Sequence, residues 1–170
     1  MSACPRLPAA HEADARYRRA RELGAGGDRA AMVAEWLEVL RLDSAAPPKR
    51  LMGTEEFEAV AEAALAELPQ DLLARLGNVA VIVADRPSPE MVADGIDPRV
   101  LGLYHGVPLA RRSVSFGAPY ADTIHLFSVN LERVCTTRAE LAARIRIVVL
   151  HETAHFFGYS ETQLRAMGLA

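Results

Sequence analysis

The chain has 170 residues, of which 51% are hydrophobic and 24% are charged, a balance that is ordinary for a globular protein with a substantial core. Its formal net charge is −3, so the sequence gives no reason to expect nucleic acid or an anionic membrane as a partner. No apolar run approaches the length of a transmembrane helix, so we expect no membrane association.

The first 48 residues predict a helical hairpin followed by a linker. Residues 10–23 are rich in Ala, Arg and Glu, and residues 29–42 carry apolar side chains at a helical spacing after the N-cap candidate Asp28. The run Ala-Ala-Pro-Pro at residues 45–48 ends the second helix. This helix resembles the second helix of a tetratricopeptide unit, yet a single unit cannot bury its own apolar face. We expect the hairpin to pack on the main domain, and binding of a protein partner is the alternative.

Residues 51–170 predict a second domain that mixes helices and strands. Thr54 is expected to cap a helix that Pro69 ends, and a short helical turn is expected at residues 71–76. Residues 85–99 contain three prolines and are predicted to form a loop or a lid. Short apolar runs between turn signals predict strands at residues 78–84, 101–107 and 123–128. The last of these runs alternates in the way that suits a half-exposed edge strand.

A central buried helix is predicted to begin at the capping box of residues 137–140 and to end at or just past His155. Residues 145–150 are apolar nearly all round, which is typical of a helix in a core. The same helix then presents His151, Glu152 and His155. Two histidines four residues apart share one helix face and can bind one Zn²⁺, and Glu152 can serve as the general base for a metal-activated water.

The residues after this helix suggest a third metal ligand. Gly158 can adopt the left-handed conformation that ends a helix. Ser160 can cap a short last helix, with Gln163 completing a second capping box. This turn is expected to return Glu161 toward the two histidines, which gives a His₂Glu zinc set with a fourth position open for water.

Other polar residues are weaker candidates for the same site. His105 and His125 lie on predicted strands, and either is an alternative third ligand or a substrate contact. A solvated or hydrogen-bonded strand histidine is the simpler interpretation of both. Tyr104, Tyr120 and Tyr159 are candidates for stabilising an oxyanion, with packing as the simpler role for each.

The length of the motif decides how specific it is. The pattern HExxH fixes three positions, and about one chain of this length in a few hundred contains it by chance. The added glycine and acid, at positions 158 and 161, lower that chance by about another hundredfold. The remaining alternatives are histidines on an ordinary helix, and a zinc ion that only holds the end of the chain in place.

Further residues between positions 54 and 168 occur in the order and spacing of a known family. They are Phe57, Leu68-Pro69, residues 78–83, residues 101–104, residues 106–109, Ile124, and the run from His151 to Glu161 followed by Leu164. In these residues the chain resembles the minimal zincins, small bacterial zincin-like proteins regarded as zinc metallopeptidases.

The resemblance implies a compact α+β domain, in which a small mixed sheet has an edge strand beside the central helix. It also implies His151, His155 and the acid at 161 as zinc ligands, with Glu152 as base. The chain departs from the family at two positions. Glu161 stands where the family more often has Asp, and His105 stands where the family often has an acid.

The sequence therefore predicts a zinc-dependent metallopeptidase that hydrolyses short or unfolded peptides, with an extended peptide paired to residues 123–128 by strand addition. One alternative is a zinc-stabilised adaptor protein that recruits a partner through the hairpin, and another is a zinc amidohydrolase with a non-peptide substrate. We expect a cytoplasmic protein, because the N-terminus lacks the apolar segment of a signal peptide. Cys4 and Cys135 have no ligand spacing and are expected to be free thiols, with a disulfide as the alternative.

Overall fold

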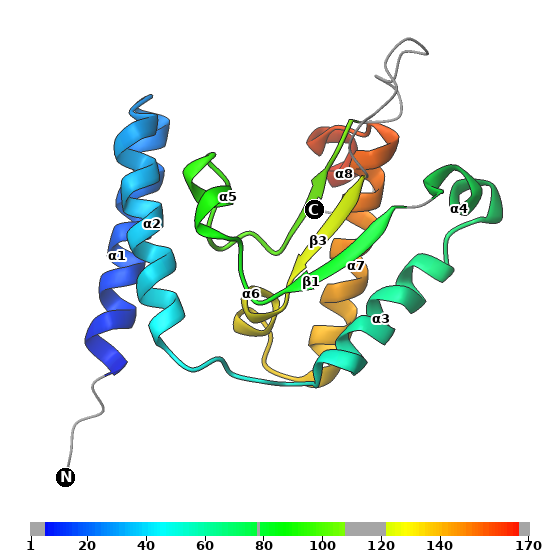
Figure 1. The fold of residues 1–170 in the computed structure, drawn as a ribbon, viewed down its shortest axis with the longest axis horizontal. Helices are drawn as coiled ribbons and strands as arrows, with labels where there is room; N and C mark the ends of the chain where they lie inside the picture. The colour runs from blue at the N-terminus through cyan, green and yellow to red at the C-terminus, as the bar shows by residue number, and fades with distance from the viewer. Residues whose placement is uncertain (1–5, 78, 108–121, 167–170) are drawn as a thin grey trace. The chain divides into compact units, whose positions relative to one another are not determined.

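The computed structural model describes residues 6–77, 79–107 and 122–166, and it has the α+β architecture expected from the sequence (Figure 1). The chain divides into two compact units. The first comprises Met1–Pro48 and Arg86–Val100, and the second comprises Lys49–Asp85 and Leu101–Ala170. The domain limits predicted from the sequence, 1–48 and 51–170, remain predictions.

The first unit is built on the predicted helical hairpin. Helices α1 (Arg6–Ala25) and α2 (Arg29–Ala45) lie side by side (Figure 1). The side chain of Asp28 caps α2 by accepting a hydrogen bond from the Ala31 N–H at 3.0 Å, as predicted. The apolar contacts of the hairpin centre on Trp36, which is 9% exposed.

The segment predicted to be a loop or a lid contains a short helix, α5 (Pro89–Ala93), and belongs to the first unit. Arg99 pairs with both carboxylate oxygens of Asp43, at 2.8 and 3.1 Å. The Tyr17 hydroxyl donates a hydrogen bond of 2.5 Å to Asp97. Burial and this bond raise the pKa of Tyr17 to about 12. These contacts tie the segment to the hairpin.

In its described residues, the second unit contains a mixed sheet of three strands in the order β1-β3-β2. Strand β1 (Ala80–Ala84) runs parallel to β3 (Thr123–Phe127), and β2 (Gly102–His105) runs antiparallel to it. The prediction that residues 123–128 form an edge strand was wrong, because β3 lies between the other two. Its alternation arises because one face of the sheet is buried, with Ile124 and Leu126 both 0% exposed.

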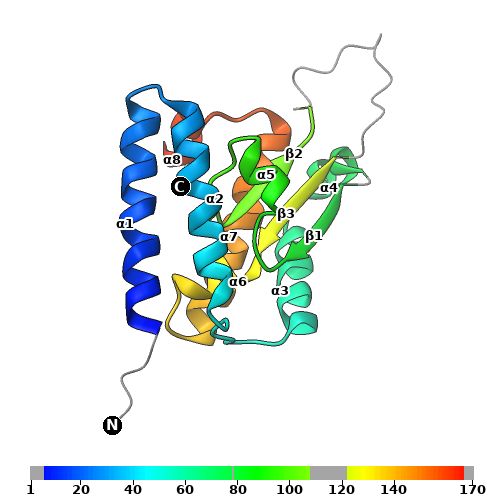
Figure 2. The ribbon, with the colours of Figure 1, turned by 60° about the vertical axis from the view of Figure 1, so that its left-hand side comes forward.

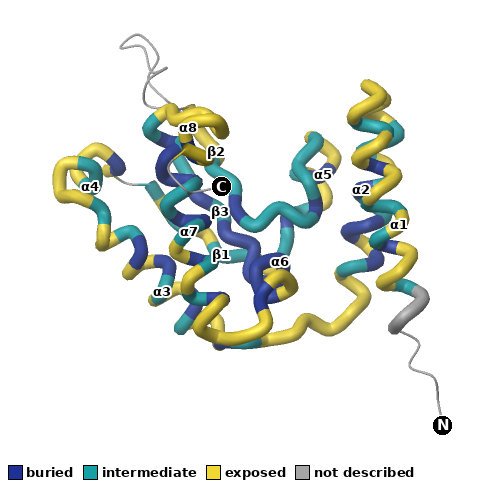
Figure 3. The backbone as a smooth tube through the Cα atoms, turned by 180° about the vertical axis from the view of Figure 1, so that it is seen from behind, coloured by how far each residue is buried: buried dark blue, intermediate teal, exposed yellow. Residues whose placement is uncertain are grey.

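Two helices pack on this buried face of the sheet. They are α3 (Thr54–Ala66) and α7 (Arg138–Phe157), whose backbones are drawn in Figures 2 and 3. Their apolar side chains join those of β3 in one core. Gly53, not the predicted Thr54, occupies the N-cap position of α3. Among the described residues, no helix combines the length and the apolar character needed to cross a membrane.

The remaining helices of the second unit are short. Helix α4 (Gln70–Leu76) was predicted, and so was α8 (Glu161–Ala166) after the long helix. Helix α6 (Ser128–Arg133) was not predicted, because its six residues are too few to show a helical period. It follows β3 directly and buries two acidic or amide side chains, those of Asn130 and Glu132.

Candidate metal centre

Helix α7 places the HExxH motif at the end of a firmly anchored element. Its N-cap Thr137 accepts a hydrogen bond from the Glu140 N–H at 3.1 Å, as the capping box predicts. Ile145 and Val149 are fully buried in the core. Because the helix is held along its length, the direction of the side chains in its last turns is set as well.

The chain reverses direction directly after the motif. Gly158 has φ 90° and ψ 14°, the left-handed conformation expected of a glycine that ends a helix. The N–H of Ser160 donates to the side-chain oxygen of Gln163 at 2.8 Å, and the N–H of Gln163 donates to Ser160 Oγ at 3.4 Å. Both predicted capping interactions are therefore confirmed, and Glu161 begins the short helix α8.

The side chains of His151, His155 and Glu161 converge in space. His155 Nε2 lies 3.0 Å from His151 Nε2 and 3.1 Å from Glu161 Oε1. His151 Nε2 lies 3.5 Å from the same carboxylate oxygen. Ligand atoms around a tetrahedral zinc with bonds of about 2.0–2.1 Å are about 3.3 Å apart. The three side chains thus fit a zinc ion with little rearrangement, and the donor set is one that zinc uses.

The orientation of His155 suits a metal ligand. Its Nδ1 lies 3.1 Å from the backbone carbonyl of Tyr159. A carbonyl oxygen can only accept, so this contact places a proton on Nδ1, and Nε2, the atom that faces His151 and Glu161, is the one available to a metal ion. Tyr159 thus takes part through its main chain, while its side chain is 43% exposed. This contact gives no support to the role in stabilising an oxyanion that the sequence suggested for the Tyr159 hydroxyl.

Glu152 is held beside the histidines and is only 7% exposed. Its Oε2 accepts a hydrogen bond of 2.8 Å from the backbone N–H of Tyr104 in β2. Burial raises the pKa of the Glu152 carboxyl, and the bond from Tyr104 opposes that rise. A buried carboxylate with a raised pKa is typical of a general base.

The two histidines on strands, His105 and His125, lie outside the cluster of His151, His155 and Glu161. Among the residues that the structure describes, the group able to hold a metal ion consists of His151, His155 and Glu161. His125 Nε2 instead lies 3.2 Å from Thr123 Oγ1, and burial lowers the pKa of His125. His105 is exposed at the end of β2.

Tyr104 and Tyr120 are the other two tyrosines that the sequence suggested for stabilising an oxyanion. The Tyr104 hydroxyl donates to Asp122 Oδ1 at 2.7 Å, and its ring packs edge-on against Phe156 with 5.9 Å between ring centroids. Its side chain is therefore engaged in packing and in this bond. Tyr120 lies outside the described residues.

A model of the zincin-like metallopeptidase family matches residues 76–169, which is more than half of the chain. The chain belongs to this family. The resemblance seen in the sequence is thereby confirmed, and the matched range includes the whole of α7 and its turn. No curated protein matches the chain.

Gly102 allows the close contact between β2 and α7 in this zincin-like metallopeptidase domain. Its role was not predicted from the sequence. A Cβ atom on Gly102 would lie 2.5 Å from Val148 Cγ1 and 3.1 Å from Glu152 Cγ. The absence of a side chain therefore lets the strand approach the helix closely enough for Tyr104 to reach Glu152. A glycine inside a strand signals such a close backbone approach.

Substituting alanine for Gly102 should lower the free energy of unfolding by about 1–3 kcal/mol, because the added methyl group overpacks the interface with α7. Urea denaturation measures this loss. The double variant Gly102→Ala/Val148→Ala should lose less than the sum of the two single variants, since the second change makes room for the first. Gly26→Ala is the matched control, because a Cβ atom at Gly26 would lie no closer than 3.4 Å to a neighbouring atom. Equal losses for Gly102→Ala and Gly26→Ala would contradict the close approach.

Proposed function

We propose that this zincin-like protein is a zinc-dependent peptidase. In this proposal His151, His155 and Glu161 bind the zinc ion, and Glu152 is the general base. The observation that carries it is the convergence of the three side chains at separations of 3.0, 3.1 and 3.5 Å, directly beside a buried glutamate. Membership of a metallopeptidase family supports the same reaction class.

The two carboxylate oxygens of Glu152 have different tasks in the proposed reaction. When bound, zinc supplies a Lewis acid that polarises the substrate carbonyl and lowers the pKa of water toward about 7. The Tyr104 N–H holds Oε2 of Glu152 at 2.8 Å, which leaves Oε1 to take the proton of the attacking water. The same oxygen then gives the proton to the leaving amine. The Tyr159 carbonyl keeps the His155 ring in its ligating orientation.

We infer that the peptide binds along β2, because β3 is the central strand and its edges are already paired. The Phe127 N–H donates to the Leu101 carbonyl at 2.9 Å. In this antiparallel pair, every second residue counted from Leu101 therefore forms its backbone hydrogen bonds with β3. Gly102 and Tyr104 consequently direct their backbone groups toward the opposite edge, where Glu152 lies. Strand addition at this edge requires an extended chain, which favours short or unfolded peptides as substrates.

Removal of the metal should abolish hydrolysis of unfolded protein substrates. A chelator such as 1,10-phenanthroline should stop cleavage of a reduced, unfolded protein, and added Zn²⁺ should restore it, because only the metal supplies the Lewis acid. The appearance of new peptide termini, followed by mass spectrometry, measures cleavage. Cleavage that continues in the metal-free protein would contradict the proposal. Zinc binding with no cleavage of any peptide would favour a non-catalytic role.

A further inference from the structure

The outer edge of β1 ends the sheet, and among the strands that the structure describes none pairs with it (Figures 1 and 2). The Ala80 N–H donates to the Asp122 carbonyl at 3.2 Å, so every second residue from Ala80 to Ala84 directs its backbone groups toward β3. Val81 and Val83 consequently direct their N–H and C=O groups away from β3. These groups form a template for a further strand.

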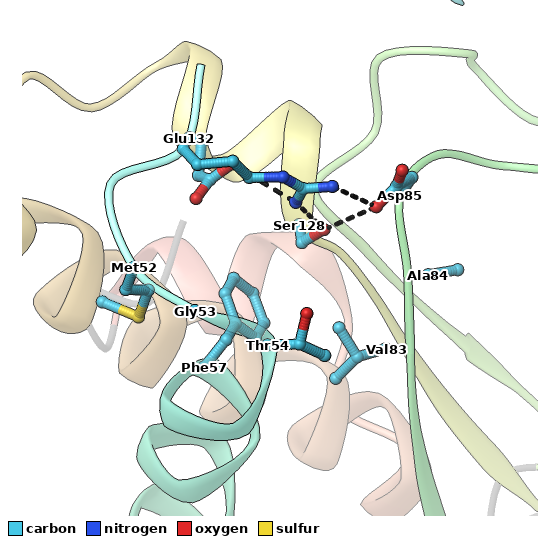
Figure 4. Close-up of a pocket in the computed structure, with 10 residues that line it drawn as sticks. Met52, Gly53, Thr54, Phe57, Val83, Ala84, Asp85, Ser128 and Glu132 are labelled. Carbon is cyan, nitrogen blue, oxygen red and sulfur yellow. Dashed lines mark hydrogen bonds and ion pairs between the residues drawn. The ribbon is translucent and has the colours of Figure 1, made fainter. Parts of the chain in front are cut away.

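The side chains of β1 alternate between the core and the opposite face of the sheet. Val81 and Val83 pack against the core. Figure 4 shows Val83 directed toward Phe57, with Ala84 on the other side of the strand. Ile82 shares the face of Ala84, because residues two apart lie on one side of a strand. It is 41% exposed, so the edge presents a large apolar side chain to solvent.

Strand β1 lacks the features by which edge strands avoid pairing with other chains. It reads Ala-Val-Ile-Val-Ala, with no charged residue and no proline. The edge of β2 differs, because the Tyr104 N–H there is already bonded to Glu152 at 2.8 Å and the strand ends at the exposed His105. Lasting association with another chain is therefore favoured at β1.

The sequence of β1 reads the same in both directions, which suits pairing with a second copy of itself. An antiparallel pair with its two-fold axis at Ile82 places alanine against alanine, valine against valine and isoleucine against isoleucine. In this register Val81 of one copy and Val83 of the other exchange both of their backbone hydrogen bonds, so no outward group is left over. Ile82 then lies beside Ile82 of the second copy, in a pair whose side chains contact closely.

We propose that the chain forms a two-fold dimer in which the β1 strands of two copies pair antiparallel about Ile82. A second copy is favoured over an unrelated strand because one register satisfies the backbone and matches the apolar side chains together. No like charges meet, since the strand carries none. The β2 strands lie at the two ends of the joined sheet, so both proposed peptide-binding edges stay open.

Sedimentation equilibrium of the full chain, from about 10 µM to about 1 mM, tests the association. A single pair of strands buries less than the roughly 1,200 Å² of a standard interface, so we expect a dissociation constant of about 0.1–1 mM. The average mass should rise with concentration from that of one chain toward that of two. A mass that stays at one chain at the highest concentration would overturn the proposal, and so would growth beyond two chains.

Two variants locate the interface. Ile82→Lys should weaken association by about tenfold or more, because it places like charges opposite each other at the axis. Val83→Pro removes an outward N–H and should weaken association similarly, while proline at such a position is tolerated in an edge strand. Val134→Lys is the matched control, because Val134 is 49% exposed and lies outside β1. Equal association of Ile82→Lys and Val134→Lys would overturn the proposal even if Val83→Pro does not fold.

Cysteine substitutions test the register in a chain with Cys4→Ser, since Cys135 is buried. Under diamide, Ile82→Cys should form a disulfide-linked dimer, because the paired Cα atoms would be about 4.5 Å apart. Ala80→Cys is the matched control on the same face, about 13 Å from its own counterpart, and should not cross-link alone. Mixed with Ala84→Cys it should cross-link. Equal cross-linking of Ala80→Cys alone and Ile82→Cys would overturn this pairing.

Discussion

Replacing Glu152 with Gln should lower the rate of peptide hydrolysis by about 10²–10⁴-fold while the protein keeps its zinc. Glutamine has almost the same size, and its amide oxygen can still accept the hydrogen bond from the Tyr104 N–H that Glu152 accepts at 2.8 Å. It cannot take a proton from water at neutral pH. The loss should therefore appear in the chemical step, with the metal content and the melting temperature close to those of the unmodified protein.

The measurement is single-turnover cleavage of an unfolded peptide, with metal analysis of the same samples. Glu62→Gln is the matched control, because Glu62 is an exposed glutamate on α3 and the substitution is chemically identical. It should cleave at the unmodified rate. Cleavage by a zinc-loaded Glu152→Gln protein at the control rate would show that Glu152 is not the general base.

Glu161→Ala should lower the affinity for zinc by more than about 100-fold. Loss of a group that only hydrogen-bonds to a metal ligand already lowers metal affinity by about 10–100-fold, and Glu161 is proposed to be a ligand itself. The reason is the position of Glu161 Oε1, 3.1 Å from His155 Nε2 and 3.5 Å from His151 Nε2. By contrast, His125→Ala should retain zinc, because His125 contacts Thr123 and lies outside the cluster. His105→Ala should also retain zinc.

Competition with a chromophoric chelator measures these affinities. Glu161→Asp is the conservative control, because it keeps a carboxylate and shortens the side chain by one methylene. It should bind zinc more tightly than Glu161→Ala. If His125→Ala loses the metal and Glu161→Ala keeps it, a strand histidine is the third ligand and the proposed ligand set is wrong.

Helix ends and the turn after the motif could be predicted from the sequence because neighbouring residues decide them. Asp28 and Thr137 each cap a helix through a hydrogen bond to a backbone N–H three residues later. Gly158 supplies the left-handed conformation, and Ser160 bonds with Gln163. The position of Glu161 near the histidines follows from these local contacts.

The strand order and the short helix α6 could not be predicted in the same way. The alternation of β3 reports which face is buried and carries no information on which strands lie beside it. Its partners, β1 and β2, come from separate parts of the chain. Helix α6 has only six residues, and the buried position of Glu132 depends on contacts with the distant Leu51.

The main-chain contacts of two tyrosines could not be predicted from the sequence. Tyr104 reaches Glu152 through its backbone N–H, and Tyr159 reaches His155 through its carbonyl. Such groups are present at every residue, so the side-chain identity does not reveal them. Gly102 is the exception, because an isolated glycine in a strand does signal the close approach that brings Tyr104 to Glu152.

The most direct test of the account is the zinc content of the full chain purified without chelators, measured by elemental analysis. Three converging side chains at tetrahedral separations predict about one zinc ion per chain. The His151→Ala/His155→Ala double variant, prepared in parallel, should contain almost none. A zinc content below about half an ion per chain, or an equal content in the double variant, would contradict the metal centre on which the proposed peptidase depends.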